Sequence, residues 1–282
     1  MHLADSIAII AREAGGLLME YFARGVETEY KGSGRADLVT AADRASEKLI
    51  VERVQAQWPE HDIIGEEGTR TAHGSEWKWY VDPLDGTTNF AHSYPVFCVS
   101  IGVEYQGELV AGVLYDPTRD ELFQAEKGAG ALLNGKPLQV SKTTHLAEAL
   151  IATGFPSKKR HLNPNVHFYH EFTMRSHGVR RAGSAALDLA YVACGRYDAY
   201  WEFNLNPWDT SAGVLLVREA GGAVTRFDGS PFRIESDEVL ASNSALQGEM
   251  LRTFADMFAG RNPAEIVSPQ EYRRGRGDEF KG

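Results

Sequence analysis

Two carboxylates and a run of small polar residues follow a buried strand near residue 80. The segment DPLDGTTNF spans Asp82 to Phe90, and the apolar residues WYV directly precede it. Two acids that leave a buried strand together are costly unless positive charge meets them, because burial removes their hydration. A plain Asp-Pro turn is the alternative for this segment. The question is therefore what neutralises Asp82 and Asp85.

Two other segments place acids beside glycine or at the expected end of an element. IIGEEGTR contains Glu66 and Glu67, and NPWDTSAG contains Asp209. Each has an ordinary structural explanation: a solvated acidic turn for the glutamates, and a helix N-cap for Asp209. Together with Asp82 and Asp85, however, these acids form the all-oxygen ligand set that hard divalent cations such as Mg²⁺ prefer.

The electrostatics of such a cluster favour bound cations. Two carboxylates about 5 Å apart repel by roughly 3 kcal/mol at an effective dielectric constant near 20. Two-metal phosphoryl transfer uses two cations about 4 Å apart, which stabilise the attacking and the leaving oxygen. Asp82 and Asp85 suit such a site, and the Leu84 carbonyl between them can add an oxygen. The acids therefore predict a Mg²⁺-dependent phosphatase.

Gly86 and Thr87 add features that suit a phosphate group. A helix that begins here would direct free N–H groups and the positive end of its dipole toward an anion. Gly86 would let the backbone approach the phosphate, and the Thr87 hydroxyl could orient a water. An ordinary helix cap is the alternative explanation for Thr87.

Composition excludes several classes of protein. The 282 residues carry a formal net charge of −10, which disfavours a general nucleic-acid surface and an unaided phosphate site. The two cysteines, Cys98 and Cys194, lie in apolar stretches and are expected to be buried free thiols in a reducing cytoplasm. We expect no membrane span, because no apolar run is long enough. Loosely clustered histidines lack zinc-ligand spacing, and GxSxG and P-loop motifs are missing.

The elements that position these residues follow from hydrophobic periodicity. Helical spacing predicts helices near 3–24 and from Thr40 to Trp58, the second opened by a Thr40–Asp43 capping box. Strand signals dominate to residue 145, and strands then alternate with helices near 161–176, 185–194 and 209–220. We predict an N-terminal α+β half at 1–145 with the metal-site acids, a C-terminal α/β half at 146–265 that completes the site, and a mobile tail at 266–282.

Three segments carry a resemblance to a known family. GEEG, DPLDGTTNF and PWDTSAGVLLVREAGG resemble the signatures of the inositol monophosphatase family, whose members are magnesium-dependent, lithium-sensitive phosphatases. ADLVTAAD and GSAALDLAYVACGRYDAYWE are also similar, so that the likeness covers about residues 3–258. GFP and RRAGSAALDLAYVA most resemble the bacterial inositol-1-monophosphatases. The resemblance implies an α/β fold, a five-layered αβαβα sandwich, and a homodimer.

The resemblance also implies roles for particular residues. The metal ligands, for two or three Mg²⁺, would be Glu66, Asp82, the Leu84 carbonyl, Asp85 and Asp209. The attacking water is expected beside Glu66 and Thr87, and Asp43 is expected to accept a hydrogen bond from Thr87. Phosphate and substrate contacts would come from Asp85, Gly86, Thr87, Gly183, Ser184, Ala185, Glu202 and Asp209. Lys31 lies near a family lysine at a third metal, although its loop spacing differs, and Glu67 would support the ligands without binding metal.

The sequence predicts the reaction better than the substrate. Inositol monophosphate is the expected phosphate monoester. Histidinol phosphate or a sugar (bis)phosphate is the alternative on the same fold, whereas nucleotide 3′-phosphatases usually have KEF in place of TNF. A protein of this fold with an additional regulatory binding role is a further alternative.

Overall fold

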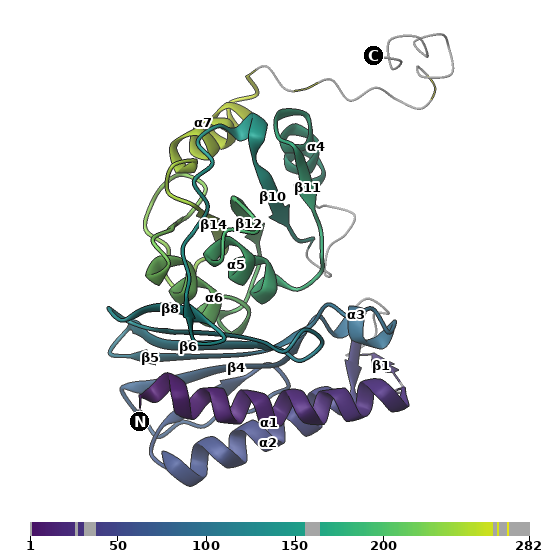
Figure 1. Cartoon of the computed structure of the whole chain (residues 1–282), viewed down its shortest axis with the longest axis vertical. Coiled ribbons are helices and arrows are strands. Elements are labelled where there is room, and N and C mark those ends of the chain that lie inside the picture. Colours follow the sequence, from purple (N-terminus) through teal and green to yellow (C-terminus); the bar gives the residue numbers. More distant parts are fainter. Residues whose placement is uncertain are drawn as a thin grey trace.

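The computed structural model describes residues 2–25, 28–30, 38–155, 164–261, 264 and 270. Five layers are stacked in it, in the order helices, sheet, helices, sheet, helices (Figure 1). The helices of the three helical layers are, in turn, α1 (Leu3–Arg24) with α2 (Ala41–Gln57), α5 (Ala185–Ala193) with α6 (Pro207–Glu219), and α4 (Asn165–Arg175) with α7 (Gln247–Phe258). This arrangement confirms the predicted αβαβα sandwich.

The first helical layer forms as its apolar spacing predicts. Helix α1 buries the stripe that includes Ile7, Ile10 and Leu18 and ends at Gly25. In α2, Thr40 is the N-cap and forms the predicted capping box with Asp43. The helix ends at the C-cap Trp58, so the predicted bounds of both helices are confirmed.

The first sheet has seven strands and faces α1 and α2 on one side and α6 on the other (Figure 1). Its strands, in spatial order, are β3 (Asp62–Gly65), β4 (Trp77–Asp85), β5 (Cys98–Tyr105), β6 (Glu108–Asp116), β7 (Glu121–Glu126), β8 (Gly130–Leu133) and β9 (Lys136–Pro137). Strands β3 and β4 are parallel and the other pairs are antiparallel. Asn134 and Gly135 adopt positive φ at the β8–β9 turn, as the predicted Asn-Gly hairpin requires.

The second sheet has five strands and lies between the two remaining helical layers. Its spatial order is β11 (Gly178–Arg180), β10 (Leu150–Thr153), β12 (Ala199–Phe203), β14 (Glu238–Ser242) and β13 (Ala223–Thr225). Strand β10 runs parallel to both neighbours, whereas β14 is antiparallel to β12 and β13. The division into halves at residue 145 stays a prediction, because one buried cluster joins both sheets through α5 and α6.

Helix α6 packs very closely on the first sheet. A Cβ on Gly112 of β6 would lie 2.8 Å from the Cα of Ala212 in α6. Only glycine lets the helix backbone approach the sheet this far. Because Asp209 lies in the first turn of α6, this contact fixes its distance from the end of β4.

The structure differs from the sequence prediction in several places. Strand β4 runs through Asp82 to Asp85, with a shift in register between them, so the two acids lie on a bulged strand end and not on a simple turn. Asn206, not Asp209, is the N-cap of α6. Helix α4 begins at Asn165, and residues 156–163 lie outside the described part. The prediction missed β1 (Thr28–Tyr30), β2 (Leu38–Thr40), β3, the 3₁₀ turn η1 (Leu146–Glu148) and α7.

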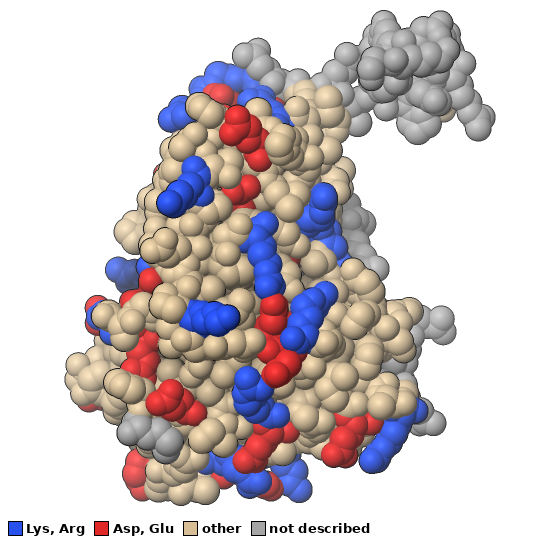
Figure 2. Space-filling view, in the orientation of Figure 1, with Lys and Arg blue, Asp and Glu red and all other residues tan. Residues whose placement is uncertain are grey.

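The structure also bears on the expectations for membrane spans, cysteines, surface charge and the C-terminal tail. In the described residues no helix is long and apolar enough to cross a membrane. Both cysteines are free, although Cys194 is only partly buried. The face in Figure 2 carries basic and acidic side chains interspersed. The predicted tail falls outside the described residues except for 270.

Candidate functional site

Four of the predicted acids come together at the end of β3 and β4. Gly65 pairs with Val81 in parallel register, so Glu66 and Asp82 leave neighbouring strands at the same edge. Burial raises the pKa of Asp82 well above its usual range, and the charges of Glu66, Asp85 and Asp209 raise it further. Burial and the Glu66 charge likewise raise the pKa of Asp209. The four carboxylates, called the acid cluster below, are therefore near enough for their charges to raise the pKa values of Asp82 and Asp209.

Asp85 connects the first sheet to α5. Its Oδ2 accepts hydrogen bonds from the Ser184 hydroxyl at 2.6 Å and from the Ala186 N–H at 2.7 Å. Ser184 is the N-cap of α5, so Asp85 also interacts favourably with the positive end of this helix. Burial still raises the pKa of Asp85 to about 6, against the lowering effect of these bonds. Sequence reasoning did not find this helix contact.

Asp209 is held by its own helix terminus. Its Oδ2 accepts the Asn206 N–H at 2.7 Å, and the Asn206 side chain returns the contact in a capping box. Trp208, directly before it, is anchored to the sheet because its carbonyl accepts the Ser100 hydroxyl at 3.2 Å. The acid is therefore fixed by local bonds at one oxygen.

Asp43, Thr87 and Leu84 form a small hydrogen-bonded group. The Thr87 hydroxyl lies 3.0 Å from Asp43 Oδ1 and 3.1 Å from the Leu84 carbonyl. It has one proton for these two acceptors. Donation to Asp43 leaves the Leu84 carbonyl available to another partner. Burial raises the pKa of Asp43, opposed by its bonds to Thr40 and Thr87.

The Gly86–Thr87 helix is shorter than a phosphate site built on a helix dipole would need. Helix α3 spans only Thr87–Ala91, with Gly86 as a left-handed N-cap at φ 100°. A Cβ on Gly86 would also lie 2.8 Å from the Val96 carbonyl. Backbone conformation and packing thus require this glycine, apart from any role in phosphate binding.

Glu202, a predicted substrate contact, and Asp188 form a second pair of buried acids. Glu202 accepts a 2.6 Å hydrogen bond from Tyr200, and burial raises its pKa to about 7. Asp188, in the first turn of α5, is 1% exposed. Its Oδ1 has no hydrogen-bond partner among the described residues. Burial, followed by the Glu202 and Asp85 charges, raises the pKa of Asp188.

The predicted Gly183–Ser184–Ala185 contact lies at the start of α5, next to Asp85. Asn89 Nδ2 donates to the Ala182 carbonyl at 2.9 Å, which ties this loop to α3. Ser184 as a whole is only 1% exposed, and its hydroxyl already donates to Asp85. A substrate would therefore meet the partly exposed Gly183 and Ala185 more readily than Ser184.

Sequence reasoning missed Glu47, which accepts hydrogen bonds from the loop that follows Glu66. This buried α2 side chain accepts the Glu67 N–H at 2.8 Å, and the Thr69 N–H and hydroxyl at 3.1 and 2.7 Å. Glu47 lies one helical turn after Asp43, and that spacing was the available signal. Lys31 lies outside the described residues.

The donor chemistry fits hard cations, but the acids do not enclose one as they stand. In the described part of the chain, no three His, Cys, Asp or Glu side chains converge closely enough to hold an ion. Each of Asp82, Asp85 and Asp209 has one oxygen hydrogen-bonded to backbone N–H groups. None of these three forms an ion pair with a described Lys or Arg side chain. Oxygen ligands and uncompensated negative charge are what a Mg²⁺ site requires.

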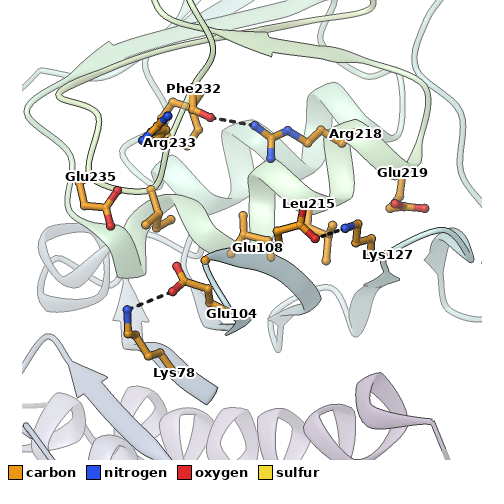
Figure 3. A pocket seen from close by; sticks show the side chains of 13 residues that line it. Lys78, Glu104, Glu108, Lys127, Leu215, Arg218, Glu219, Phe232, Arg233 and Glu235 are labelled. Carbon is orange, nitrogen blue, oxygen red and sulfur yellow. Dashed lines mark hydrogen bonds and ion pairs between the residues drawn. The ribbon is translucent and has the colours of Figure 1, made fainter. Parts of the chain in front are cut away.

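A cavity of about 600 Å³ lies elsewhere, between the first sheet and the far end of α6. Figure 3 shows ion pairs at its edge, between Lys78 and Glu104 and between Lys127 and Glu108. None of the predicted site residues lines it. The acid cluster, and not this cavity, is therefore the candidate site.

Comparisons with known proteins identify the family to which the chain belongs. A model of the inositol monophosphatase family matches residues 3–257. The chain belongs to the inositol monophosphatase family. It is 46% identical over 237 residues to an inositol-1-monophosphatase of Synechocystis sp., covering 82% of each chain. It is 43% identical to the Nus factor SuhB of Pseudomonas aeruginosa, covering 86% of this chain and 92% of that protein.

Solved structures of inositol monophosphatases share the fold. The enzyme from Anabaena is 41% identical with a TM-score of 0.81, covering 92% of this chain and 96% of its own. The Thermotoga maritima enzyme is 33% identical with a TM-score of 0.83, covering 91% and 98%. The predicted family and fold are confirmed, and the protein is a phosphatase of the inositol monophosphatase family.

Proposed function

We propose that this phosphatase hydrolyses inositol monophosphate to inositol and phosphate and depends on Mg²⁺. The supporting observation is the cluster of four carboxylates at the ends of β3 and β4, where the charges of Glu66, Asp85 and Asp209 all act on Asp82. Two or three Mg²⁺ would be held by Glu66, Asp82, the Leu84 carbonyl, Asp85 and Asp209. When bound, the ions would supply positive charge to the phosphate oxygens and lower the pKa of water.

The protein side chains position the reactants. Thr87 donates to Asp43, so its oxygen can accept a hydrogen bond from a water beside Glu66. The backbone at Gly86 and Thr87 would contact the phosphate, while Asp85 stays fixed by its bonds to α5. Glu202, oriented by Tyr200, accepts hydrogen bonds from the polyol, and Asp209 helps to place the leaving alcohol.

The substrate can be tested with Glu202→Gln. We expect catalytic efficiency on inositol 1-phosphate to fall about tenfold, or 1.4 kcal/mol, because the polyol loses a charged acceptor. Nitrophenyl phosphate, which lacks the polyol, should be hydrolysed almost unchanged with Mg²⁺, and chelator should abolish both activities. No loss on either ester would remove Glu202 from the pocket and favour histidinol phosphate or a sugar phosphate.

A second candidate role comes from the relatives. Proteins named Nus factor SuhB are 40–43% identical to this chain over 86–91% of its length. A Nus-factor role beside hydrolysis is therefore the second proposal. It predicts that an inactive Asp85→Asn protein still rescues a strain lacking this gene. Failure of the inactive variant, with rescue by the active protein, would assign the phenotype to hydrolysis.

The same family resemblance supports three further parts of the proposal. They are inhibition by millimolar lithium, a cytoplasmic location and a homodimer. Activity that resists lithium, or a monomeric mass in solution, would contradict the respective part.

A further inference from the structure

Arg70 contacts the chain segment that carries Glu66 and the segment that carries Asp209. Its Nη1 donates to the carbonyl of Gly65, the residue before Glu66, and to the Thr69 carbonyl at 2.6 Å. Its guanidinium carbon lies 5.0 Å from the ring centroid of Trp208, the residue before Asp209. A single side chain thus links the residues that directly precede Glu66 and Asp209.

The Gly65–Arg70 loop is closed by further bonds. The Gly65 N–H donates to the Thr69 carbonyl at 2.9 Å, and the Glu66 N–H donates to Val81 at 3.0 Å. Arg70 adds its bond to Gly65 on the outer side of this loop. Glu66 is therefore held between β4 on one side and Arg70 on the other.

The backbone of Trp208 is held by α6 and by Ser100, but its ring is less constrained. Its indole Nε1 is buried and has no hydrogen-bond partner among the described residues. The ring is placed by packing and by the guanidinium on its face. The planar guanidinium can stack on the ring while its Nη1 donates to both carbonyls.

We propose that Arg70 is a positioning residue that sets the separation of Glu66 and Asp209 and thereby the affinity for Mg²⁺. The proposal rests on the proposed function, since it assumes that these acids bind Mg²⁺. Arg70 is itself solvent-exposed, so its replacement removes the link without opening the core. Within the described part of the chain, the side-chain contacts of Arg70 are with the Gly65 and Thr69 carbonyls and the Trp208 ring, and not with a carboxylate of the cluster.

The test compares Mg²⁺ binding by titration calorimetry, without substrate, in Arg70→Ala, Arg70→Lys and wild type. We expect about tenfold weaker binding in both variants, because lysine keeps the charge but has no planar group to stack on the Trp208 ring. Arg12→Ala is the matched control. Arg12 lies on α1, and its guanidinium carbon is 4.8 Å from the ring centroid of Tyr115 on β6. This control variant should bind Mg²⁺ as wild type does.

Hydrogen exchange in chelator provides the second measurement. Arg70→Ala should raise exchange both in residues 65–71 and at the start of α6, whereas Arg12→Ala should change neither. Unchanged Mg²⁺ affinity in Arg70→Ala, or full rescue by lysine, would overturn the proposal. If wild type bound no Mg²⁺, the proposed function would fail, and faster exchange confined to one segment would separately refute the link.

Discussion

Asp85 has the most defined surroundings of the clustered acids. It accepts bonds from Ser184 and Ala186 and lies within the influence of Glu66. Asp85→Asn keeps an oxygen that can accept both bonds but removes the charge. We expect a rate loss of two or more orders of magnitude, about 3 kcal/mol or more, in a phosphatase assay with saturating Mg²⁺.

Folding should survive this substitution, because the loss of one charge also relieves repulsion among the acids. The control is Asp62→Asn, a buried acid that accepts the N–H groups of His73 and Ser75 at the opposite end of β3 from Glu66. It should keep activity near wild type. A near-normal rate in Asp85→Asn would reduce Asp85 to a helix-capping residue.

Short motifs predicted individual acids well and their partners poorly. The spacing of DPLDGTT and GEEG indicated Asp82, Asp85 and Glu66, because each motif is contiguous in sequence. Arg70 and Glu47 act through segments distant in the chain or through backbone groups, which residue type alone does not reveal. The Thr87–Asp43 bond was available only from the resemblance, since 44 positions separate its two residues.

Among the elements, α5 has two buried acids at its N-terminus, its own Asp188 and Asp85 of β4. Asp85 contacts its first turn from outside, and Asp188 lies in that turn with a pKa raised by burial and by Glu202. In the folded protein Asp188 is therefore either protonated or buried as a charged group at a cost in stability. The free energy of unfolding should fall as pH rises above 3.8, the ordinary pKa of the group, toward its folded value.

Asp188→Asn should remove this pH dependence. Relative to wild type, the variant should gain little stability near pH 4 and more at pH 7–8, because asparagine needs no bound proton. Urea unfolding at both pH values, in chelator, measures the difference. If the variant gained the same stability at both pH values, or lost stability increasingly as pH rises, Asp188 would be ionised in the folded protein.

Element prediction succeeded where periodicity was long and failed where elements were short. The capped α1 and α2 were predicted to within a residue or two, whereas β3 has only four residues and its alternation cannot be recognised. Helix α7 does have a periodic stripe, with Met250 and Phe254 buried, so its signal was present and overlooked. The course of β4 through Asp-Pro-Leu-Asp could not be predicted, because the bulge depends on pairing with β5.

At the scale of the whole molecule, the acid cluster lies where the first sheet meets the central helical layer. Asp82 and Asp85 belong to the first sheet, Asp85 contacts α5, and Asp209 belongs to α6. Cations bound there would join the sheet to the central helices. Without them, repulsion among the acids acts against this contact, so Mg²⁺ should stabilise the entire fold and not only the site.

Mass action gives the size of this effect. At Mg²⁺ concentrations 100 times the dissociation constant, stability should rise by about 2.7 kcal/mol, which corresponds to an increase in Tm of about 5 °C for a chain of 282 residues. Calorimetry in chelator and in Mg²⁺, at matched ionic strength, measures it. Asp85→Asn should start from a higher Tm in chelator and gain less from Mg²⁺. Equal Tm values for wild type with and without Mg²⁺ would mean that the four acids do not bind the ion, since binding to the folded state alone must raise Tm.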